Sequence, residues 1–293
     1  MWIPLATCGL AIVAARAEDA APRYVRQDPV ATLQSPAVGE ASGLAISPAQ
    51  PDRLWLINDS GCAAELHRTD TQGADLGKVP VLGVKNTDWE DLSSFNYKGK
   101  PYLLIADTGD NTSSRPQCQL HVVAEPKQTD REAAVVWSIP FTYEDGPRDC
   151  ESVAVDEKAG KILLLSKRTT PPLLYELPLK PAGNAPQVAR KVGKITDPLA
   201  AGVPPVPFGT QPTGLALSPD GKLAAVVTYF RVFLFPRAEG ESWETAFGRR
   251  AVVLEPHRLR QAESIGFSRD GKELFTVSEG AKSPLVRYRT GKE

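Results

Sequence analysis

One short pattern occurs five times along this chain and constrains the fold more than any other feature. In each copy a small or acidic residue precedes a short alternating apolar strand, and a turn and a second apolar strand follow. The clearest turns are residues 218–221 and 268–271, which are rich in Ser, Asp and Gly. The first strands of the five copies are expected at residues 41–46, 89–92, 150–155, 212–217 and 262–267. Several short strands per repeat without helical periodicity predict an all-β fold, a β-propeller.

The spacing of the repeats predicts the number of blades. The equivalent positions are Ser42, Glu90, Glu151, Thr213 and Glu263, separated by 48, 61, 62 and 50 residues. The segments before the first and after the last of these positions together amount to one more blade length. We therefore expect five blades, with a strand near residues 24–33 closing the last blade as its outer strand. A six-bladed ring is the alternative, but the Pro-rich stretch 197–207 is too short to supply the extra blade.

Composition limits the partners of the chain. Lys and Arg number 34 against 35 Asp and Glu, giving a net charge of -1, so nucleic acid is not an expected partner. No apolar run approaches the roughly 20 residues that span a bilayer, so no transmembrane segment is expected. We expect residues 18–293 to form a single propeller domain and the protein to be a monomer.

The first 17 residues are expected to be a signal peptide. Residues 3–15 are weakly apolar, and Ala15-Arg16-Ala17 fits a small-residue cleavage site. The start lacks the usual positive charge, so an ordinary N-terminal tail is one alternative. A lipoprotein site at Cys8 fits less well, because Thr7 precedes the cysteine. Export would place the protein in the periplasm or outside the cell.

Three cysteines remain after residue 17, so one disulfide at most can form. Cys62 and Cys118 each follow a predicted second strand, in adjacent blades. The sequence predicts that they form a disulfide and that Cys150 stays a buried thiol.

The five equivalent positions are predicted to converge on the axis, because the first strand of each propeller blade lines it. They carry three carboxylates and two hydroxyls, namely Ser42, Glu90, Glu151, Thr213 and Glu263. Oxygen ligands without Cys or His suit a hard cation, and a flexible ring of them favours Ca²⁺ over Mg²⁺. The alternative is a water-filled channel whose glutamates pair with nearby Lys or Arg.

Two resemblances accompany these residues. The order Ser, Glu, Glu, Thr, Glu is similar to that of the calcium-activated nucleotidases of the apyrase family, five-bladed propellers with an axial calcium. The resemblance implies calcium ligands at these five positions. It stops there, since no segment matches the family's nucleotide contacts, and nucleotidase activity is not implied.

The second resemblance covers nearly the whole mature chain. Residues 88–91 (DWED), 107–111 (DTGDN), 228–229 (TY) and 276–280 (TVSEG) resemble an exported bacterial propeller family. The activity of that family is unassigned, and some relatives are labelled phytase-like or esterase-like. This resemblance implies the fold and says little about chemistry.

A rim of polar residues is expected around the same end of the axis. The end of each second strand lies beside the start of the first, so residues 16 or 17 positions after each axial residue belong to this rim. A phosphorylated ligand could bind there, with Asp59 or Asp107 activating water as general base. The expected ligand contacts are Asp88, Asp110, Asn111, Lys167, Arg168, Tyr229, Arg231 and Glu279. The alternative is that these loop charges are merely solvated.

Two functional classes stay open. One is an exported calcium-dependent hydrolase of phosphate or carboxylic esters, acting on a small anionic ligand. The other is a non-catalytic propeller that binds a peptide, a glycan or another envelope component. No nucleophile-elbow, zinc-protease, Walker or dinucleotide motif occurs, which excludes those chemistries as sequence-based predictions.

Overall fold

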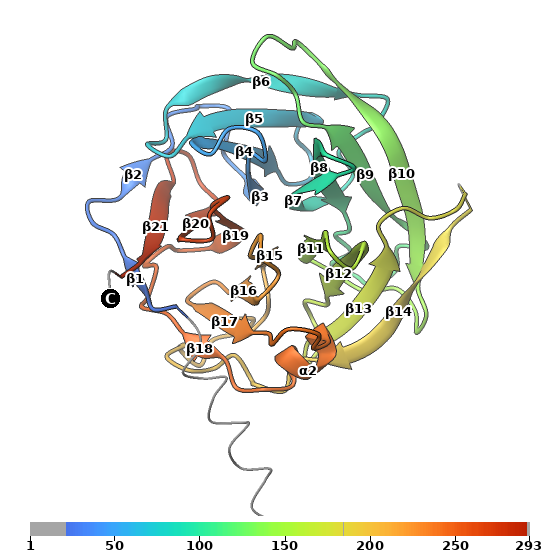
Figure 1. Ribbon diagram of the computed structural model, residues 1–293, viewed down its shortest axis with the longest axis vertical. Coiled ribbons are helices and arrows are strands. Elements are labelled where there is room, and N and C mark those ends of the chain that lie inside the picture. The colour runs from blue at the N-terminus through green and yellow to red at the C-terminus, as the bar shows by residue number, and fades with distance from the viewer. Residues whose placement is uncertain (1–21, 184, 292–293) are drawn as a thin grey trace, which may run out of the picture.

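The predicted β-propeller is confirmed. The computed structural model describes residues 22–183 and 185–291, so the predicted signal peptide, residues 1–17, lies outside the described part. Within that part, five antiparallel units of four strands surround a common axis (Figure 1).

The blades follow one another in chain order. Blade 1 consists of β3 (Ala41–Ile46), β4 (Arg53–Asn58), β5 (Glu65–Asp70) and β6 (Asp75–Leu82). Blade 2 consists of β7 (Trp89–Tyr97), β8 (Lys100–Asp107), β9 (Cys118–Ala124) and β10 (Ala133–Tyr143). Blade 3 consists of β11 (Ser152–Asp156), β12 (Lys161–Leu165), β13 (Leu173–Pro178) and β14 (Gln187–Lys194). Blade 4 consists of β15 (Gly214–Leu217), β16 (Leu223–Val227), β17 (Val232–Pro236) and β18 (Val252–Val253).

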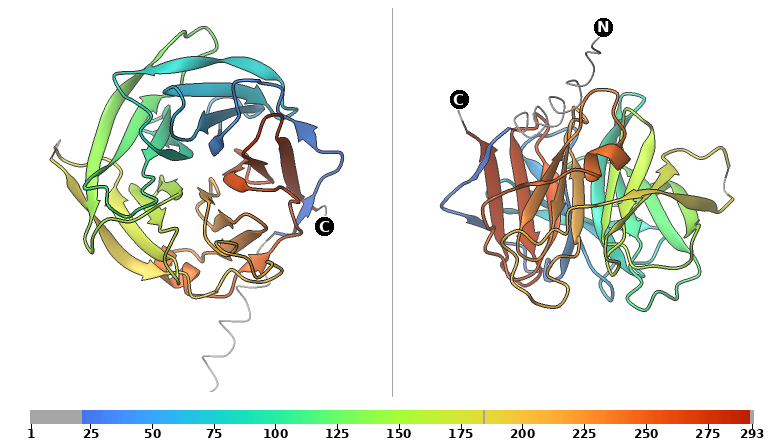
Figure 2. Two further views of the ribbon diagram at one scale, coloured as in Figure 1. Left: turned by 180° about the vertical axis from the view of Figure 1, so that it is seen from behind. Right: turned by 90° about the horizontal axis from the view of Figure 1, so that it is seen from below.

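Blade 5 joins the two ends of the described chain, as the spacing predicted. It consists of β19 (Ala262–Phe267), β20 (Glu273–Ser278) and β21 (Pro284–Thr290), completed by β1 (Tyr24–Arg26) as the outer strand. Tyr24 pairs with Thr290, and β2 (Ala31–Thr32) also pairs with β21. Residues 197–207 contain no strand, so they do not form a sixth blade. The ring is visible from behind and from its side in Figure 2.

The innermost strands β3, β7, β11, β15 and β19 pack side by side around the axis. Close packing at the axis needs small residues, and Gly43 is one of them. A Cβ atom at Gly43 would lie 2.6 Å from the backbone nitrogen of Leu92 in the next blade. Alanine at this position would therefore push two inner strands apart.

Apolar side chains fill the space between neighbouring blades. Trp55 and Trp89 are fully buried between blades 1 and 2. One element was not predicted from the sequence, the short helix α2 (Trp243–Phe247), whose N-cap is Ser242. Its buried Trp243 and Phe247 pack between blades 3 and 4, where the helix contacts the outer strand β14 and the third strand β17.

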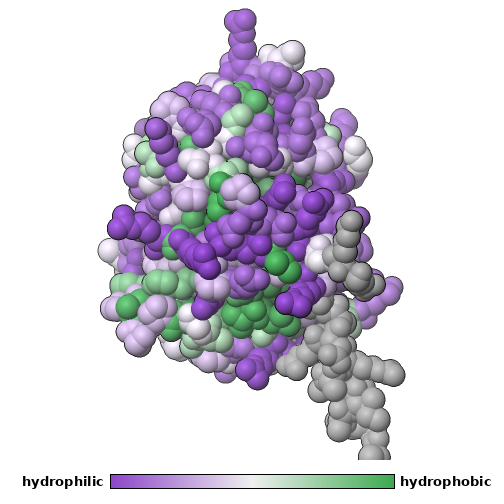
Figure 3. All heavy atoms as spheres, turned by 90° about the vertical axis from the view of Figure 1, so that its left-hand side faces the viewer, coloured by the Kyte–Doolittle hydropathy of each residue, from purple (hydrophilic) through white to green (hydrophobic). Residues whose placement is uncertain are grey.

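Outer strands also connect three blades. In β10 the first residues pair in parallel with β6, and the last residues pair in parallel with β14. On the side wall that carries β1, β2 and β21, hydrophilic residues predominate and apolar ones occur in small groups (Figure 3). No helix among residues 22–183 and 185–291 has the length and apolar character needed to cross a membrane.

The predicted disulfide between Cys62 and Cys118 is wrong: Cys62, Cys118 and Cys150 are all free thiols. Cys118 belongs to the core between blades 2 and 3, so its side chain faces away from blade 1, where Cys62 lies. The sequence could place both cysteines near the ends of strands but could not tell which face of the blade each one occupies. Cys150 is a buried thiol, as predicted.

We expect the three thiols to differ sharply in reactivity. Burial raises the pKa of Cys118 to about 12 and raises that of Cys150 as well, so neither is a thiolate at neutral pH. Cys62 is partly exposed. Peptide mass spectrometry after iodoacetamide treatment should show Cys62 modified in the native protein and the other two only after denaturation. A recovered Cys62–Cys118 disulfide peptide would contradict the packing described here.

Candidate functional site

The two groups of predicted site residues meet at one end of the ring. The inner strands start there and the second strands end there, since Trp89 pairs with Asp107 and Ala41 pairs with Asn58. We call this the acidic end of the axis. The predicted relation between axial and rim positions is therefore confirmed.

Five carboxylates from blades 1 to 3 converge at the acidic end. Glu90, Asp149 and Glu151 each offer a ligand atom within 4.8 Å of the other two, and all three are buried. Asp59 and Asp88 form a second group of the same kind with Glu90. We call these five residues the carboxylate cluster. Asp59, Asp88 and Glu90 take part in no ion pair within the described chain.

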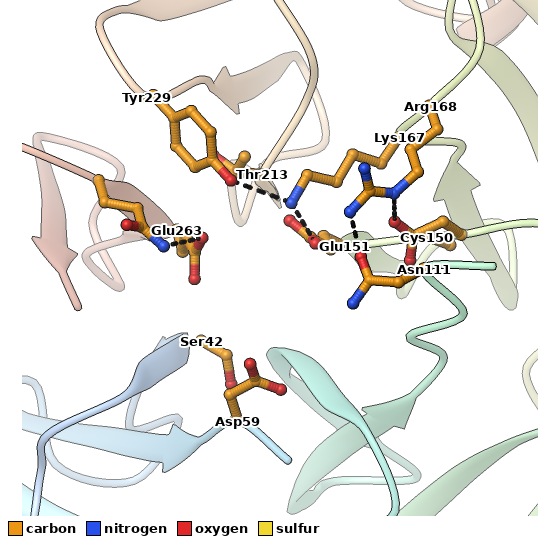
Figure 4. Close-up of polar contacts among 12 residues, drawn as sticks. Ser42, Asp59, Asn111, Cys150, Glu151, Lys167, Arg168, Thr213, Tyr229 and Glu263 are labelled. Carbon is orange, nitrogen blue, oxygen red and sulfur yellow. Dashed lines mark hydrogen bonds and ion pairs between the residues drawn. The ribbon is translucent and has the colours of Figure 1, made fainter. Parts of the chain in front are cut away.

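The two carboxylate oxygens of Glu151 have different surroundings. Its Oε1 accepts a hydrogen bond from the ammonium of Lys167, which also donates to the hydroxyl of Tyr229 at 3.2 Å (Figure 4). Its Oε2 is buried and has no hydrogen-bond partner among residues 22–183 and 185–291. Because a buried carboxylate oxygen without a donor is costly, this atom points to a ligand.

The guanidinium groups at this end are paired with acids. Arg168 donates to Asp149 Oδ2 at 2.7 Å and also to Asn111 (Figure 4). Arg115 donates to Asp107 Oδ1 at 2.5 Å. Asp107 also accepts from the backbone N–H groups of Thr87 and Asp88. Both carboxylate oxygens of Asp107, one of the two predicted general bases, therefore already accept hydrogen bonds.

The hydroxyls of two predicted calcium ligands donate hydrogen bonds to the neighbouring blade. The hydroxyl of Ser42 donates to the carbonyl of Trp89 at 2.7 Å, and that of Thr213 donates to the carbonyl of Ala262 at 2.6 Å. Each hydroxyl thus bridges its inner strand to the next blade. The sequence placed both residues correctly at the start of an inner strand, but it did not show these bonds to the next blade.

The loop after β8 fits closely against the cluster. Gly109 faces Glu90 and Asp88: a Cβ atom there would lie 2.3 Å from Glu90 Oε1 and 2.4 Å from Asp88 Oδ2. Asp110 accepts from the backbone N–H groups of Ser114 and Arg115. Asp110, predicted as a ligand contact, therefore shapes the turn, and a side chain at position 109 would displace the carboxylates of Glu90 and Asp88.

The remaining predicted residues lie on the side of blades 4 and 5. Gln261 donates to Glu263 at 3.0 Å and to Glu279 at 2.5 Å, so its amide joins two acids. Arg231 contacts Gly202, since a Cβ atom on Gly202 would lie 2.5 Å from its guanidinium. These residues are not members of the carboxylate cluster.

Burial and mutual repulsion raise the pKa values of the carboxylates. Burial, followed by the charge of Glu151, raises the pKa of Glu90 well above its ordinary value. Burial and the charge of Asp59 raise the pKa of Asp88 to about 6. Burial also raises the pKa of Glu151, but the enclosed ammonium of Lys167, which contacts the Glu151 carboxylate, opposes this.

The buried carboxylate of Asp91 connects three blades through hydrogen bonds. It is fully buried, and its carboxylate accepts backbone N–H groups of Leu92, Val153 and Leu215, from blades 2, 3 and 4. The equivalent positions of the other blades carry Gly43, Ser152, Gly214 and Ser264. One carboxylate among glycines and serines is the sequence signal that could have revealed this role.

At the opposite end of the axis lies a small cavity of about 60 Å³. Its lining is mixed: Leu44, Leu92 and Leu215 are apolar, whereas Asp156 and Lys158 are charged.

Metal-free protein should lose stability as the pH rises from about 6.5 to 8. Burial, followed by Glu279, raises the pKa of Glu263 to about 8, so the folded state holds a proton that the unfolded chain releases near pH 4.5. Stability therefore falls through this window. Buried histidines with lowered pKa values act in the opposite sense, but only below about pH 6.5. Chelator-treated protein melted at pH 6.5 and 8 tests this, and Glu263→Gln should flatten the slope.

Comparison with known proteins adds the following. No family model and no curated protein matches the chain. Among solved structures, a nidogen/laminin complex matches with 14% identity and a TM-score of 0.46, over 82% of this chain and 73% of that one. The hydrazine synthase of Kuenenia stuttgartiensis matches with 14% identity and a TM-score of 0.38, over 82% and 56%.

The Cps50 (Swd1) β-propeller domain of Myceliophteria thermophila matches with 10% identity and a TM-score of 0.46, over 92% of this chain and all of that one. Identities this low concern the fold alone, and the five blades rest on the strand pairing described above.

Proposed function

We propose that this propeller binds a divalent cation, Ca²⁺ in preference to Mg²⁺, in the carboxylate cluster. The observation that carries the proposal is the convergence of Glu90, Asp149 and Glu151, with Glu151 Oε2 buried and unpartnered. Several carboxylates this close repel one another unless a proton or a cation intervenes. Donor sets made only of oxygen favour a hard cation, and ligands from three separate blades suit the larger, less regular shell of Ca²⁺.

The charges around the cluster support a cation and not a directly bound anion. Lys167, Arg168 and Arg115 are each paired with an acid. Asp59, Asp88 and Glu90 have no cationic partner within the described residues. A small anionic ligand would therefore reach this end through the bound cation. Residues Glu90, Asp149 and Glu151 would hold that cation, with Asp59 and Asp88 on its other side.

A second candidate is hydrolysis of a phosphate or carboxylic ester. A bound Ca²⁺ would polarise the ester oxygen. The observation that favours it is Asp59, which lies beside Asp88 and Glu90 and whose carboxylate accepts only from the neighbouring N–H of Ser60. Asp59 is therefore free to hold a proton taken from water, whereas Asp107 is not. The alternative, a non-catalytic binder of an envelope component, uses the same cation without a base.

Metal analysis and calorimetric titration of chelator-treated protein test the cation. One Ca²⁺ per chain, with much weaker Mg²⁺ binding, is expected, and absence of binding would refute the proposal. A panel of phosphate and carboxylic esters, with and without Ca²⁺, then separates hydrolase from binder. Activity that is lost in Asp59→Asn and kept in the exposed control Asp52→Asn supports the hydrolase. Export to a calcium-rich compartment remains part of this proposal.

A further inference from the structure

We propose that the ammonium of Lys167 neutralises the carboxylates of Glu151 and Glu263 on the side of the axis formed by blades 3 to 5. Only the side formed by blades 1 to 3 is then left for a divalent ion. This inference rests on the proposed cation site for the identity of that ion. The role of Lys167 itself rests on the contacts described next.

Lys167 is enclosed at the acidic end. The residue follows β12, and its backbone N–H donates to the carbonyl of Asp149 at 3.0 Å. Only 3% of its surface is exposed, and Glu151 is 5% exposed. Its ammonium contacts the Glu151 carboxylate and lies 5.3 Å from the centre of the Tyr229 ring. A fully desolvated ammonium on the axis is rare unless acids compensate it.

Three blades contribute to the surroundings of this ammonium. Glu151 comes from blade 3, Tyr229 follows β16 of blade 4, and Glu263 in β19 of blade 5 lies on the other side of the axis (Figure 4). Both Glu151 and Glu263 raise the pKa of Lys167. The ammonium therefore takes the place that the sequence assigned to an axial calcium between these two glutamates.

Glu151 connects the two halves of the acidic end. One oxygen accepts from Lys167, and the other has no protein partner. Lys167 thus fixes the orientation of a carboxylate that the cluster also uses. Without the ammonium, Glu151 and Glu263 would face each other with no positive charge, and added calcium would have a second place to bind.

Lys167→Met tests the inference by melting curves with chelator and with millimolar Ca²⁺. In chelator the variant should melt of the order of 10 °C below the parent, because a buried acid loses its partner. Calcium should recover at least half of that loss, a larger gain than the parent shows. The matched control is Lys161→Met, which removes an exposed ion pair with Glu176 in the same blade and should change little.

If the single variant does not fold in chelator, the double variant Lys167→Met with Glu151→Gln provides the test instead. It removes both charges, so it should melt above the single variant without metal and gain less from calcium. Parent-like melting of Lys167→Met, or a loss that calcium does not reduce, overturns the inference. If the parent ignores calcium while Lys167→Met responds, the proposed function fails and this inference stands.

Discussion

Asp91→Ala should lower the stability of the propeller by at least about 3 kcal/mol. The change leaves the backbone N–H groups of Leu92, Val153 and Leu215 buried without an acceptor. Each orphaned donor costs about 1–3 kcal/mol. Since three blades lose a shared contact, the melting temperature should fall by about 6–12 °C.

Two equivalent positions supply matched controls for Asp91. Ser152 and Ser264 occupy the same layer in blades 3 and 5, and their hydroxyls are buried without hydrogen-bond partners in the described part of the chain. Ser152→Ala and Ser264→Ala should therefore be neutral or slightly stabilising. Thermal unfolding of the three variants is the measurement. Equal losses in all three would mean that the layer tolerates no substitution and that Asp91 has no special role.

Glu151→Gln and Glu90→Gln should have opposite effects in the absence of metal. Glu151→Gln leaves the ammonium of Lys167 buried without a countercharge, which should cost about 3–5 kcal/mol with or without calcium. Glu90 has no ion-pair partner among the residues that the structure describes, and burial with the charge of Glu151 raises its pKa. Glu90→Gln therefore relieves repulsion, and in chelator it should melt at or above the parent temperature.

Calcium titration distinguishes the two variants further. The parent should gain about 2.7 kcal/mol when free calcium is 100 times its dissociation constant. Glu90→Gln should lose most of this gain, because Glu90 belongs to both carboxylate groups. A Glu90→Gln variant that is destabilised in chelator would show that Glu90 serves the fold through contacts other than the cluster.

The sequence was sufficient to predict the ring of blades and the gathering of acidic residues at one end of its axis. Repeats at regular spacing fix which strands are innermost, and hairpin geometry then places Glu90 beside Asp107 without any knowledge of side chains. Position along a strand is therefore predictable. The direction of a side chain at the axis is not, since it depends on which neighbour in another blade competes for it.

The errors follow from this limit. Ser42 and Thr213 were predicted to face the axis but donate to the next blade. Cys118 was assigned to the wrong side of its blade. The sequence did not reveal that Asp149 lies close to Glu90, because this closeness depends on a contact between blades 2 and 3. Gly109 was noted only as part of the 107–111 motif, since its role is the space that it leaves for two carboxylates.

The central claim is that the carboxylate cluster binds calcium, and the melting temperature of the parent protein tests it most directly. The cluster residues come together only in the folded ring, so an ion bound there must stabilise the fold. Removal of metal by a chelator should lower the melting temperature, and Ca²⁺ should restore it at concentrations where Mg²⁺ does not. A melting temperature indifferent to chelator, Ca²⁺ and Mg²⁺ alike would contradict the account.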